Sequence, residues 1–272
     1  LKVSRRALVP RPETELLAEP GWQFLLATPK QSEGGSTLSS QLPTVLDFGT
    51  GTGFRDIARA VKEQTRGRAP VILTISEDST RAAAKVIERA AKLGVDGLMV
   101  LPAMRYIATP NEVTAHFRAM AKASDLDIMI YNNPVAYGID VTPDMLADLA
   151  DEPKFVAIKE SSGDPRRITD IFNRVGDRYQ IFTGVDDLAF ESLLLGAVGW
   201  VAGLVCAFPR ETVAIHALLR EGRIVEAREI YRWFMPMLHH DGAQRGGQNS
   251  KLAENLVRGT WTRTRAPRGD LE

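Results

Sequence analysis

The stretch "DIMIYNNPVAYGIDVTPDMLADLADEPKFVAIKE", residues 127–160, decides the fold, because it holds one complete strand–helix–strand unit. Its two ends, 127–133 and 154–160, are continuous apolar runs, which is typical of parallel strands that are covered on both faces. The segment 142–151 between them predicts a helix, with Pro143 in its first turn. Two strands joined through a helix run in the same direction, so the stretch predicts a parallel sheet.

The same rhythm of strand and then helix runs through most of the chain. Seven such units in series favour an α/β fold, a (β/α)8 TIM-type barrel with extra C-terminal helices, in which 44–48 is the second strand and the first strand is incomplete or substituted. A doubly wound open sheet is the alternative, and it would usually need a glycine-rich first turn that binds a nucleotide. Strands are predicted over 44–48, 70–76, 96–102, 127–133, 154–160, 179–184 and 199–205, and helices over 54–67, 78–94, 111–124, 142–151, 164–176, 187–197, 209–222 and 224–240.

Composition divides the chain into three parts. Residues 1–43 form an irregular N-terminal segment, 44–240 form the barrel, and 241–272 form a polar, basic tail with one helix. A parallel barrel needs all its strands, since an open edge leaves backbone N–H and C=O groups unpaired. The run "WQFLLAT" at 22–28 is a plausible first strand, which predicts that part of the N-terminal segment closes the ring.

Charge and composition exclude several classes of partner. Of the 272 residues 44% are hydrophobic and 25% are charged, and the formal net charge is zero, so we expect neither nucleic acid nor an anionic membrane surface as a partner. No apolar run approaches the roughly 18–20 residues that span a bilayer. The single cysteine, Cys206, lies in an apolar run and is expected to be an inert core thiol. A chain without a disulfide framework fits a reducing compartment, and we expect a cytoplasmic protein.

Two polar side chains at neighbouring strand ends suggest chemistry. Tyr131 ends one predicted strand and Lys159 ends the next, and functional groups of a barrel collect at these carboxyl ends. Burial disfavours the charged form of a lysine, so part of Lys159 becomes a neutral amine that attacks a carbonyl to form a Schiff base. The tyrosine hydroxyl would shuttle the proton. The other interpretation is an ion pair of Lys159 with Glu160 or Asp186, and the strand positions alone leave both open.

Further groups at the strand ends are expected to contact a substrate. Thr50 and Thr52 follow the strand 44–48, at the end where functional groups of a barrel collect. No metal site is predicted, because the adjacent histidines His239 and His240 point in different directions on a helix. The expected substrate-binding residues are Asn132, Asn133, Ser161, Gly184, Asp186, Gly203 and Tyr106.

Four motifs in order resemble one known family. "IMIYNNPVAYGIDVTPDML", "FVAIKESSGD", "FTGVDD" and "LGAVGWVAG" are similar to segments of the dihydrodipicolinate synthase / N-acetylneuraminate lyase family of class I aldolases, over about residues 54–240. The resemblance implies that Lys159 is the Schiff-base lysine and Tyr131 the proton-relay tyrosine. It also implies a small 2-oxo acid or cyclic-imine acid as substrate, a homo-oligomer, and no cofactor, since the iminium on the lysine is itself the electron sink.

The branch of the family is a finer inference. Where the synthase has an arginine that grips a substrate carboxylate, this chain has Ala136, and "LPAMRYIA" at 101–108 alters another family motif. The segment "YNNPVAYGIDVTP" is most similar to the deaminases of hydroxyproline breakdown, which implies 1-pyrroline-4-hydroxy-2-carboxylate deaminase activity. A dihydrodipicolinate synthase-like enzyme and a 2-keto-3-deoxy sugar acid aldolase or dehydratase are the alternatives.

The first 53 residues resemble a different family. "RPETE" at 11–15 and "DFGTGTG" at 47–53 are similar to the release-factor glutamine methyltransferases, whose glycine-rich loop binds S-adenosylmethionine. Glycines of this kind let the backbone approach a ligand at a helix N-terminus. The other interpretation is a plain barrel turn in which Thr50 or Thr52 replaces the relay threonine of the aldolase family. An S-adenosylmethionine-dependent methyltransferase and an inactive fusion therefore remain as alternatives.

Overall fold

Seven parallel strands form the centre of the molecule. The computed structural model describes residues 46–48, 54–243, 245–259, 269 and 271, so the predicted strand 22–28 and the loop 49–53 lie outside the described residues. The strands pair in chain order from β1 to β7, and every pairing is parallel. They are β1 (Leu46–Phe48), β2 (Val71–Ile75), β3 (Gly97–Val100), β4 (Ile128–Asn132), β5 (Phe155–Glu160), β6 (Gln180–Thr183) and β7 (Gly199–Trp200).

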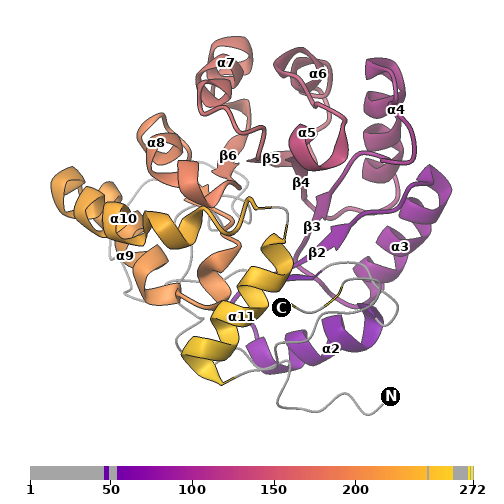
Figure 1. Cartoon of the computed structure of the whole chain (residues 1–272). Helices are drawn as coiled ribbons and strands as arrows, with labels where there is room; N and C mark the ends of the chain where they lie inside the picture. The colour runs from indigo at the N-terminus through magenta and orange to yellow at the C-terminus, as the bar shows by residue number, and fades with distance from the viewer. Residues whose placement is uncertain (1–45, 49–53, 244, 260–268, 270, 272) are drawn as a thin grey trace, which may run out of the picture.

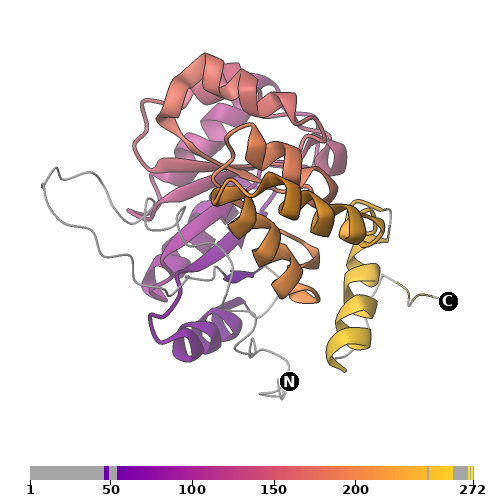
Figure 2. The same ribbon diagram turned by 90° about the vertical axis from the view of Figure 1, so that its left-hand side faces the viewer.

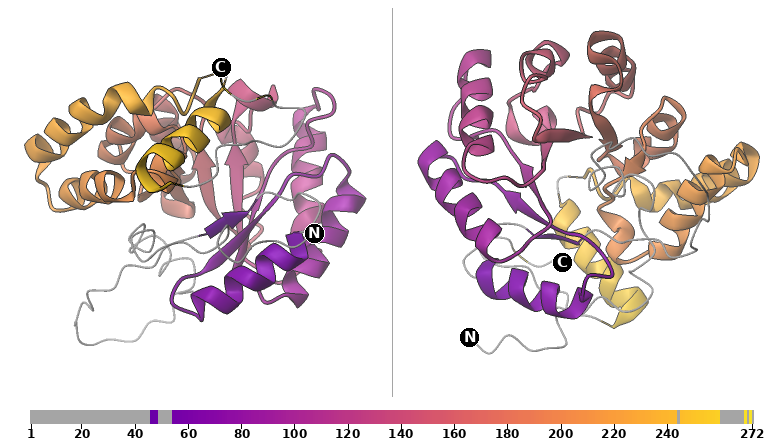
Figure 3. Two further views of the ribbon diagram at one scale, coloured as in Figure 1. Left: turned by 60° about the horizontal axis from the view of Figure 1, so that its bottom comes forward. Right: turned by 180° about the vertical axis from the view of Figure 1, so that it is seen from behind.

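The helices lie along the outside of this curved sheet. Figure 1 and Figure 3 show them in an arc around the strands, each helix following its strand in the chain. Figure 2 shows α11 at one side of the molecule. The α-helices are α2 (Phe54–Thr65), α3 (Thr80–Lys92), α4 (Pro110–Ala121), α5 (Pro134–Tyr137), α6 (Pro143–Asp148), α7 (Arg166–Val175), α8 (Ala189–Leu194), α9 (Pro209–Arg220), α10 (Ile224–Leu238) and α11 (Gly246–Arg258), and the 3-10 turns are η2 (Gly176–Arg178), η3 (Asp186–Leu188) and η4 (Leu204–Cys206).

The strand order distinguishes the two predicted architectures. A doubly wound sheet reverses its order at a switch point, and the order β1 to β7 contains no reversal. The described strands form a parallel half-barrel with helices outside, which agrees with the barrel prediction as far as these residues reach. Within the described part of the chain, β1 and β7 are the two edges of the sheet.

Two apolar layers cover the two sides of the sheet. The larger lies between the strands and the outer helices and contains Leu98 and Phe155, both fully buried. A smaller cluster covers the inner side, and its register places Met99, Met129 and Ala157 in one row across neighbouring strands. Because both sides are apolar, the strands read as continuous hydrophobic runs in the sequence.

The last predicted strand is shorter than expected. The run 199–205 is extended only to Trp200, and η4 follows at Leu204. The carboxylate of Asp186 accepts hydrogen bonds from Trp200 Nε1 and from the backbone N–H groups of Gly203 and Leu204, which turns the chain out of the strand direction. Cys206, at the end of η4, is exposed, so the expectation of a core thiol is wrong.

One helix, α5, falls outside the helical segments that the sequence predicts. α5 begins where Asn133 Oδ1 accepts the N–H of Ala136 and Pro134 occupies the first turn, and it ends at Gly138 with φ 72°. α11 lies in the tail 241–272, where the sequence predicts one helix. Among the described helices, none has both the length and the apolar character that crossing a bilayer requires.

A matched pair of leucines tests this placement of the core. Leu98 in β3 is fully buried, whereas Leu256 in α11 is 76% exposed. Leu98→Ala should lower the free energy of unfolding by about 2–5 kcal/mol, because it leaves a cavity in close-packed surroundings. Leu256→Ala should change it by less than about 0.5 kcal/mol. Urea denaturation of both variants measures the difference, and equal losses would contradict the assignment of the core.

Candidate active site

Lys159 lies near the carboxyl end of β5, on the inner side of the sheet. It is in register with Tyr131 of β4 and Phe182 of β6, and Ala157, two residues earlier, belongs to the inner apolar cluster. Alternate residues of a strand share a face, so the Lys159 side chain follows the same side. Its Nζ lies 4.1 Å from the centroid of the Tyr131 ring, which is a cation–π contact. The structure therefore brings together the two residues that the sequence singles out.

The Tyr131 ring is held from two directions. Asn133 Nδ2 donates a hydrogen bond of 3.1 Å to Tyr131 Oη. The Tyr137 ring lies edge-to-face against it, with 5.8 Å between centroids and 88° between planes. Because Asn133 also caps α5, the loop after β4 and the orientation of the tyrosine are fixed together. Asn133 thus has a defined positioning role at this site.

Gly184, directly after β6, makes room for the lysine. A Cβ at this position would lie 2.6 Å from Lys159 Cε and 2.9 Å from Lys159 Cγ, and it would overlap the hydroxyl of Ser161. The backbone therefore packs directly against the lysine side chain. Ser161 is buried, and its Oγ has no hydrogen-bond partner among the described residues. A buried hydroxyl without a partner, next to a lysine, is a group that a ligand would satisfy.

Glu160 faces the other side of the sheet from Lys159. Its carboxylate accepts hydrogen bonds from Asn132 Nδ2 at 3.0 Å and from the backbone N–H of Ser162. Burial raises the pKa of Glu160, and these hydrogen bonds partly offset the increase. An ion pair between Lys159 and Glu160, one of the two alternatives for the lysine, is therefore wrong, because neighbouring residues of a strand point in opposite directions.

Asn132 belongs to the same outer network as Glu160. Its Oδ1 accepts the backbone N–H of Val141 at 2.8 Å, and its Nδ2 also donates to Asp140. Asp140 in turn forms an ion pair of 2.9 Å with Arg167 of α7. The Asn132 amide is buried and directed away from Lys159. Asn132 therefore does not face the inner side, where it would contact a substrate bound at the lysine.

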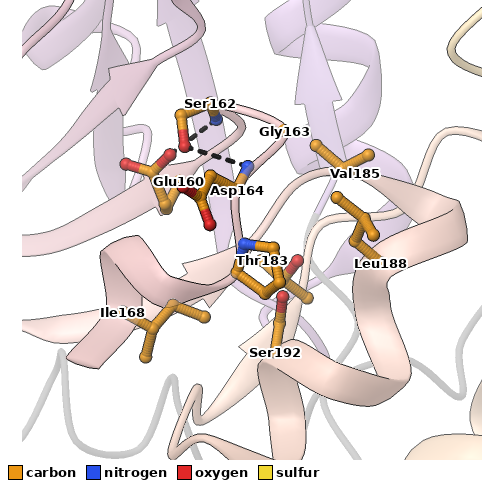
Figure 4. Close-up of a pocket in the computed structure, with 10 residues that line it drawn as sticks. Glu160, Ser162, Gly163, Asp164, Ile168, Thr183, Val185, Leu188 and Ser192 are labelled. Carbon is orange, nitrogen blue, oxygen red and sulfur yellow. Dashed lines mark hydrogen bonds between the residues drawn. The ribbon is translucent and has the colours of Figure 1, made fainter. Parts of the chain in front are cut away.

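A surface cleft on the outer side of β5 and β6 does not coincide with the lysine. It is lined by Glu160 and Thr183 from the strands, by Asp164 and Ile168 near α7, and by Ser192 of α8 (Figure 4). Figure 4 shows these side chains converging between the two helices. In barrels the chemistry is found at the carboxyl ends of the strands, so the position of Lys159 locates the candidate site better than this cleft does.

Asp186 holds the turn after β7. Its oxygens accept hydrogen bonds from Trp200 Nε1 at 2.9 Å, Gly203 N at 3.0 Å and Leu204 N at 2.8 Å. Burial, together with the negative charge of Asp241, raises the pKa of Asp186 to about 7. The Asp186 carboxylate thus accepts hydrogen bonds from two backbone N–H groups and one indole N–H. It is therefore poorly suited to an ion pair with Lys159, the other alternative that the sequence left open.

The remaining predicted residues lie apart or outside the described residues. Tyr106 is 58% exposed, and its hydroxyl donates to Glu112 at 3.3 Å on the loop before α4. Thr50 and Thr52 lie in the segment 49–53, outside the described residues, so their proposed roles stay predictions. Within the described part of the chain, no three His, Cys, Asp or Glu side chains are grouped as a metal site would need.

The sequence does not predict the position of Asp241. It follows α10 at the start of the segment assigned to the tail, and the structure brings its carboxylate against Gly203, where a Cβ would overlap it. Tyr131 and Lys159 each end a predicted strand, whereas no strand, motif or repeat in the sequence marks Asp241. A lone acid after a helix carries no signal of its position, since only the path of the chain after α10 brings it to the sheet.

Comparison with known proteins identifies the family. The sequence model of the "Dihydrodipicolinate synthetase family" matches residues 54–264, and the chain belongs to this family. It is 30% identical to the 4-hydroxy-tetrahydrodipicolinate synthase of Pelobacter propionicus over 64% of this chain and 60% of that protein. It is 29% identical to the synthase of Clostridium perfringens over 80% of this chain and 75% of that protein.

Solved structures show the same fold. The 4-hydroxy-tetrahydrodipicolinate synthase of Methylacidiphilum fumariolicum superposes with a TM-score of 0.78 at 26% identity, covering 82% of this chain and 75% of that one. The chain spans only 60–62% of the length of three of its curated relatives. Neither comparison bears on the N-terminal resemblance to methyltransferases.

The titration of Asp186 predicts a pH-dependent stability. Because its folded-state pKa of about 7 lies above the ordinary value of 3.8, ionisation of Asp186 opposes folding. Its contribution is fully present below pH 3.8 and is lost as the pH rises through about 7. Asp186→Asn cannot ionise, so its stability relative to the parent should improve over this range. Urea denaturation from pH 4 to pH 8 measures this, and parallel curves would contradict it.

Proposed function

We propose that this protein is a Schiff-base-forming lyase or deaminase that acts on a small 2-oxo acid or cyclic-imine acid. The observation that carries the proposal is the register of Lys159 with Tyr131, with the lysine Nζ over the tyrosine ring at the carboxyl ends of parallel strands. Membership of the dihydrodipicolinate synthetase family supports it. An amine at this position is suited to attack a carbonyl, which forms a carbon–nitrogen bond and releases water.

Each inner-side residue has a role in this proposal. Lys159 is the nucleophile, and Tyr131 exchanges the proton of the attacked oxygen. Ser161 Oγ, which is buried beside the lysine, donates a hydrogen bond to the substrate. Gly184 keeps open the space that the lysine side chain occupies. The apolar cluster below, with Ala157 and Phe182, keeps water away from the amine.

Deamination of 1-pyrroline-4-hydroxy-2-carboxylate is the particular reaction that we propose. Ala136 lies exposed on α5, where the synthase branch has an arginine for a second carboxylate. A substrate with a single carboxylate does not need that arginine. The relatives from Pelobacter propionicus and Clostridium perfringens are 4-hydroxy-tetrahydrodipicolinate synthases, which favours the synthase reaction as the alternative. A 2-keto-3-deoxy sugar acid is the other candidate substrate. Ammonia release from hydroxypyrroline carboxylate, measured beside pyruvate release from the sugar acid, separates these reactions.

Covalent trapping tests the lysine. Pyruvate or hydroxypyrroline carboxylate plus borohydride should modify Lys159, and peptide mass mapping should find the adduct on no other lysine. Lys159→Arg keeps the charge but cannot form the imine, so trapping and turnover should both vanish. Lys154→Arg is the matched control, because Lys154 lies at the opposite end of β5 and donates to Ala121 O and Ser124 O. Turnover by Lys159→Arg near the parental rate would refute the proposal.

Removal of one hydroxyl tests the tyrosine. Tyr131→Phe keeps the ring face under Lys159 Nζ but removes the group that exchanges protons. Turnover should fall by roughly 10²–10⁴-fold, the usual range for a lost acid–base group. The thermal midpoint should change little, since Tyr131 Oη has only Asn133 as a hydrogen-bond partner among the described residues. A loss of less than about threefold would show that the proton takes another route.

A further inference from the structure

The outer cleft, the concave site between α7 and α8 in Figure 4, takes no part in the proposed reaction. The empty space in it is about 200 Å³, part of which is open to solvent. Most ligand sites have roughly 300–1,000 Å³, so a ligand of the outer cleft must be small. Three elements supply polar side chains to it: Glu160 from β5, Thr183 from β6 and Ser192 from α8.

The register of β5 and β6 brings Glu160 and Thr183 together. These two residues pair across the strands, one position after the pair of Lys159 and Phe182. Phe182 belongs to the inner apolar cluster, and side chains alternate along a strand, so Glu160 and Thr183 face outward. The sheet therefore lies between the outer cleft and the lysine amine, and a ligand of the cleft would not touch the candidate active site.

Two hydroxyl groups of the outer cleft have no hydrogen-bond partner among the described residues. Thr183 is only 1% exposed and Ser192 only 3%, and neither side chain forms a hydrogen bond with a described residue. The hydroxyl of Thr212, which is equally buried, donates to Phe208 O at 2.9 Å. Buried hydroxyl groups nearly always have a partner, so the two in the cleft indicate a group that binds there.

Glu160 has unused capacity for a positively charged partner. Its carboxylate accepts one hydrogen bond from Asn132 Nδ2 and one from Ser162 N, although a carboxylate has about four acceptor sites. The residue is buried and forms no ion pair with a described residue. Arg167, whose positive charge acts on Glu160, is itself paired with Asp140 at 2.9 Å. A cation in the cleft would offset the cost of burying this carboxylate.

The other carboxylate of the outer cleft already has a cation. Asp164 forms an ion pair with Arg166 at the start of α7, and its Oδ1 accepts the Arg166 backbone N–H. This pairing lowers the pKa of Asp164 to about 2. Glu160 therefore supplies the charge that is not yet compensated. Its attraction for a cation is strengthened by the low dielectric of the apolar walls, which are Ile168, Val185 and Leu188.

We propose that the outer cleft binds a small ammonium group between the Glu160 carboxylate and the hydroxyl groups of Thr183 and Ser192. An ammonium group carries a positive charge and donates several hydrogen bonds. One N–H would meet the carboxylate and two would meet the hydroxyl oxygens, so each unused acceptor gains a partner. The free ammonium ion and the end of a primary amine share this chemistry. Because the site joins β5, β6 and α8, its occupation should stabilise the fold.

Thermal unfolding in different chloride salts at pH 7 tests the ligand. At constant ionic strength, with sodium chloride as the baseline, ammonium chloride should raise the thermal midpoint by about 2 °C or more and should saturate. Tetramethylammonium chloride has the same charge but no N–H donor, so it should give no rise. A rise with methylammonium chloride would identify the end of a primary amine as the ligand, and a rise with ammonium alone would identify the free ion.

Three outcomes would overturn the ammonium site. The first is the absence of any rise with ammonium, which would mean that water alone fills the cleft. The second is an equal rise with tetramethylammonium, which would show an effect of charge without hydrogen bonds. The third is an equal rise with potassium chloride, which would assign the oxygens of the cleft to a metal cation.

Two variants locate the site in the cleft. Thr183→Val and Ser192→Ala each remove one hydroxyl and nearly keep the size of the side chain. Each should raise the ammonium concentration at half-saturation by about tenfold or more, because a hydrogen bond to a charged group is lost. Without ammonium both should be as stable as the parent, since neither hydroxyl has a partner to lose. Ser250→Ala is the control, because Ser250 lies on α11 and its hydroxyl donates to Gly246 O. Parental half-saturation in both cleft variants would contradict the proposal.

Discussion

The parallel register of β4 and β5 places the Lys159 ammonium over the face of the Tyr131 ring, and the candidate site is arranged around this contact. The strands fix it because Lys159 pairs with Tyr131 on one side and with Phe182 on the other. A shift of either strand by one residue would turn the side chain to the outer face. The apolar layers on both sides of the sheet oppose such a shift, since it would expose one hydrophobic set and bury polar residues in its place.

The alternation of side chains along β4 and β5 divides the polar residues into two groups. Tyr131 and Lys159 face inward, where the proposed chemistry takes place. Asn132 and Glu160, each one residue later, face outward and bond to each other at 3.0 Å. This outer pair ties the two strands together at their carboxyl ends, and Asp140 and Arg167 extend it to α7. The outer network therefore supports the position of the inner pair without contacting it.

Much of this arrangement can be predicted from the sequence, because it depends on the strands. The parts that depend on turns cannot. Continuous apolar runs predicted the strands, and the meeting of parallel strands at one edge predicted that Tyr131 and Lys159 lie together. The outward direction of Asn132 also follows from alternation, although the prediction of a substrate contact overlooked it. The exposure of Cys206 and the approach of Asp241 to Gly203 depend on turns after β7 and α10. No local pattern in the sequence specifies those turns.

The structure of the reduced pyruvate adduct would test the account most directly. A crystal of the protein treated with pyruvate and borohydride should show continuous density from Lys159 Nζ to the substrate carbon. The account predicts that Tyr131 Oη lies within about 2.6–3.2 Å of the adduct nitrogen or its substituents. An adduct on another lysine, or a Lys159 adduct directed to the outer face of the sheet beside Glu160, would contradict it.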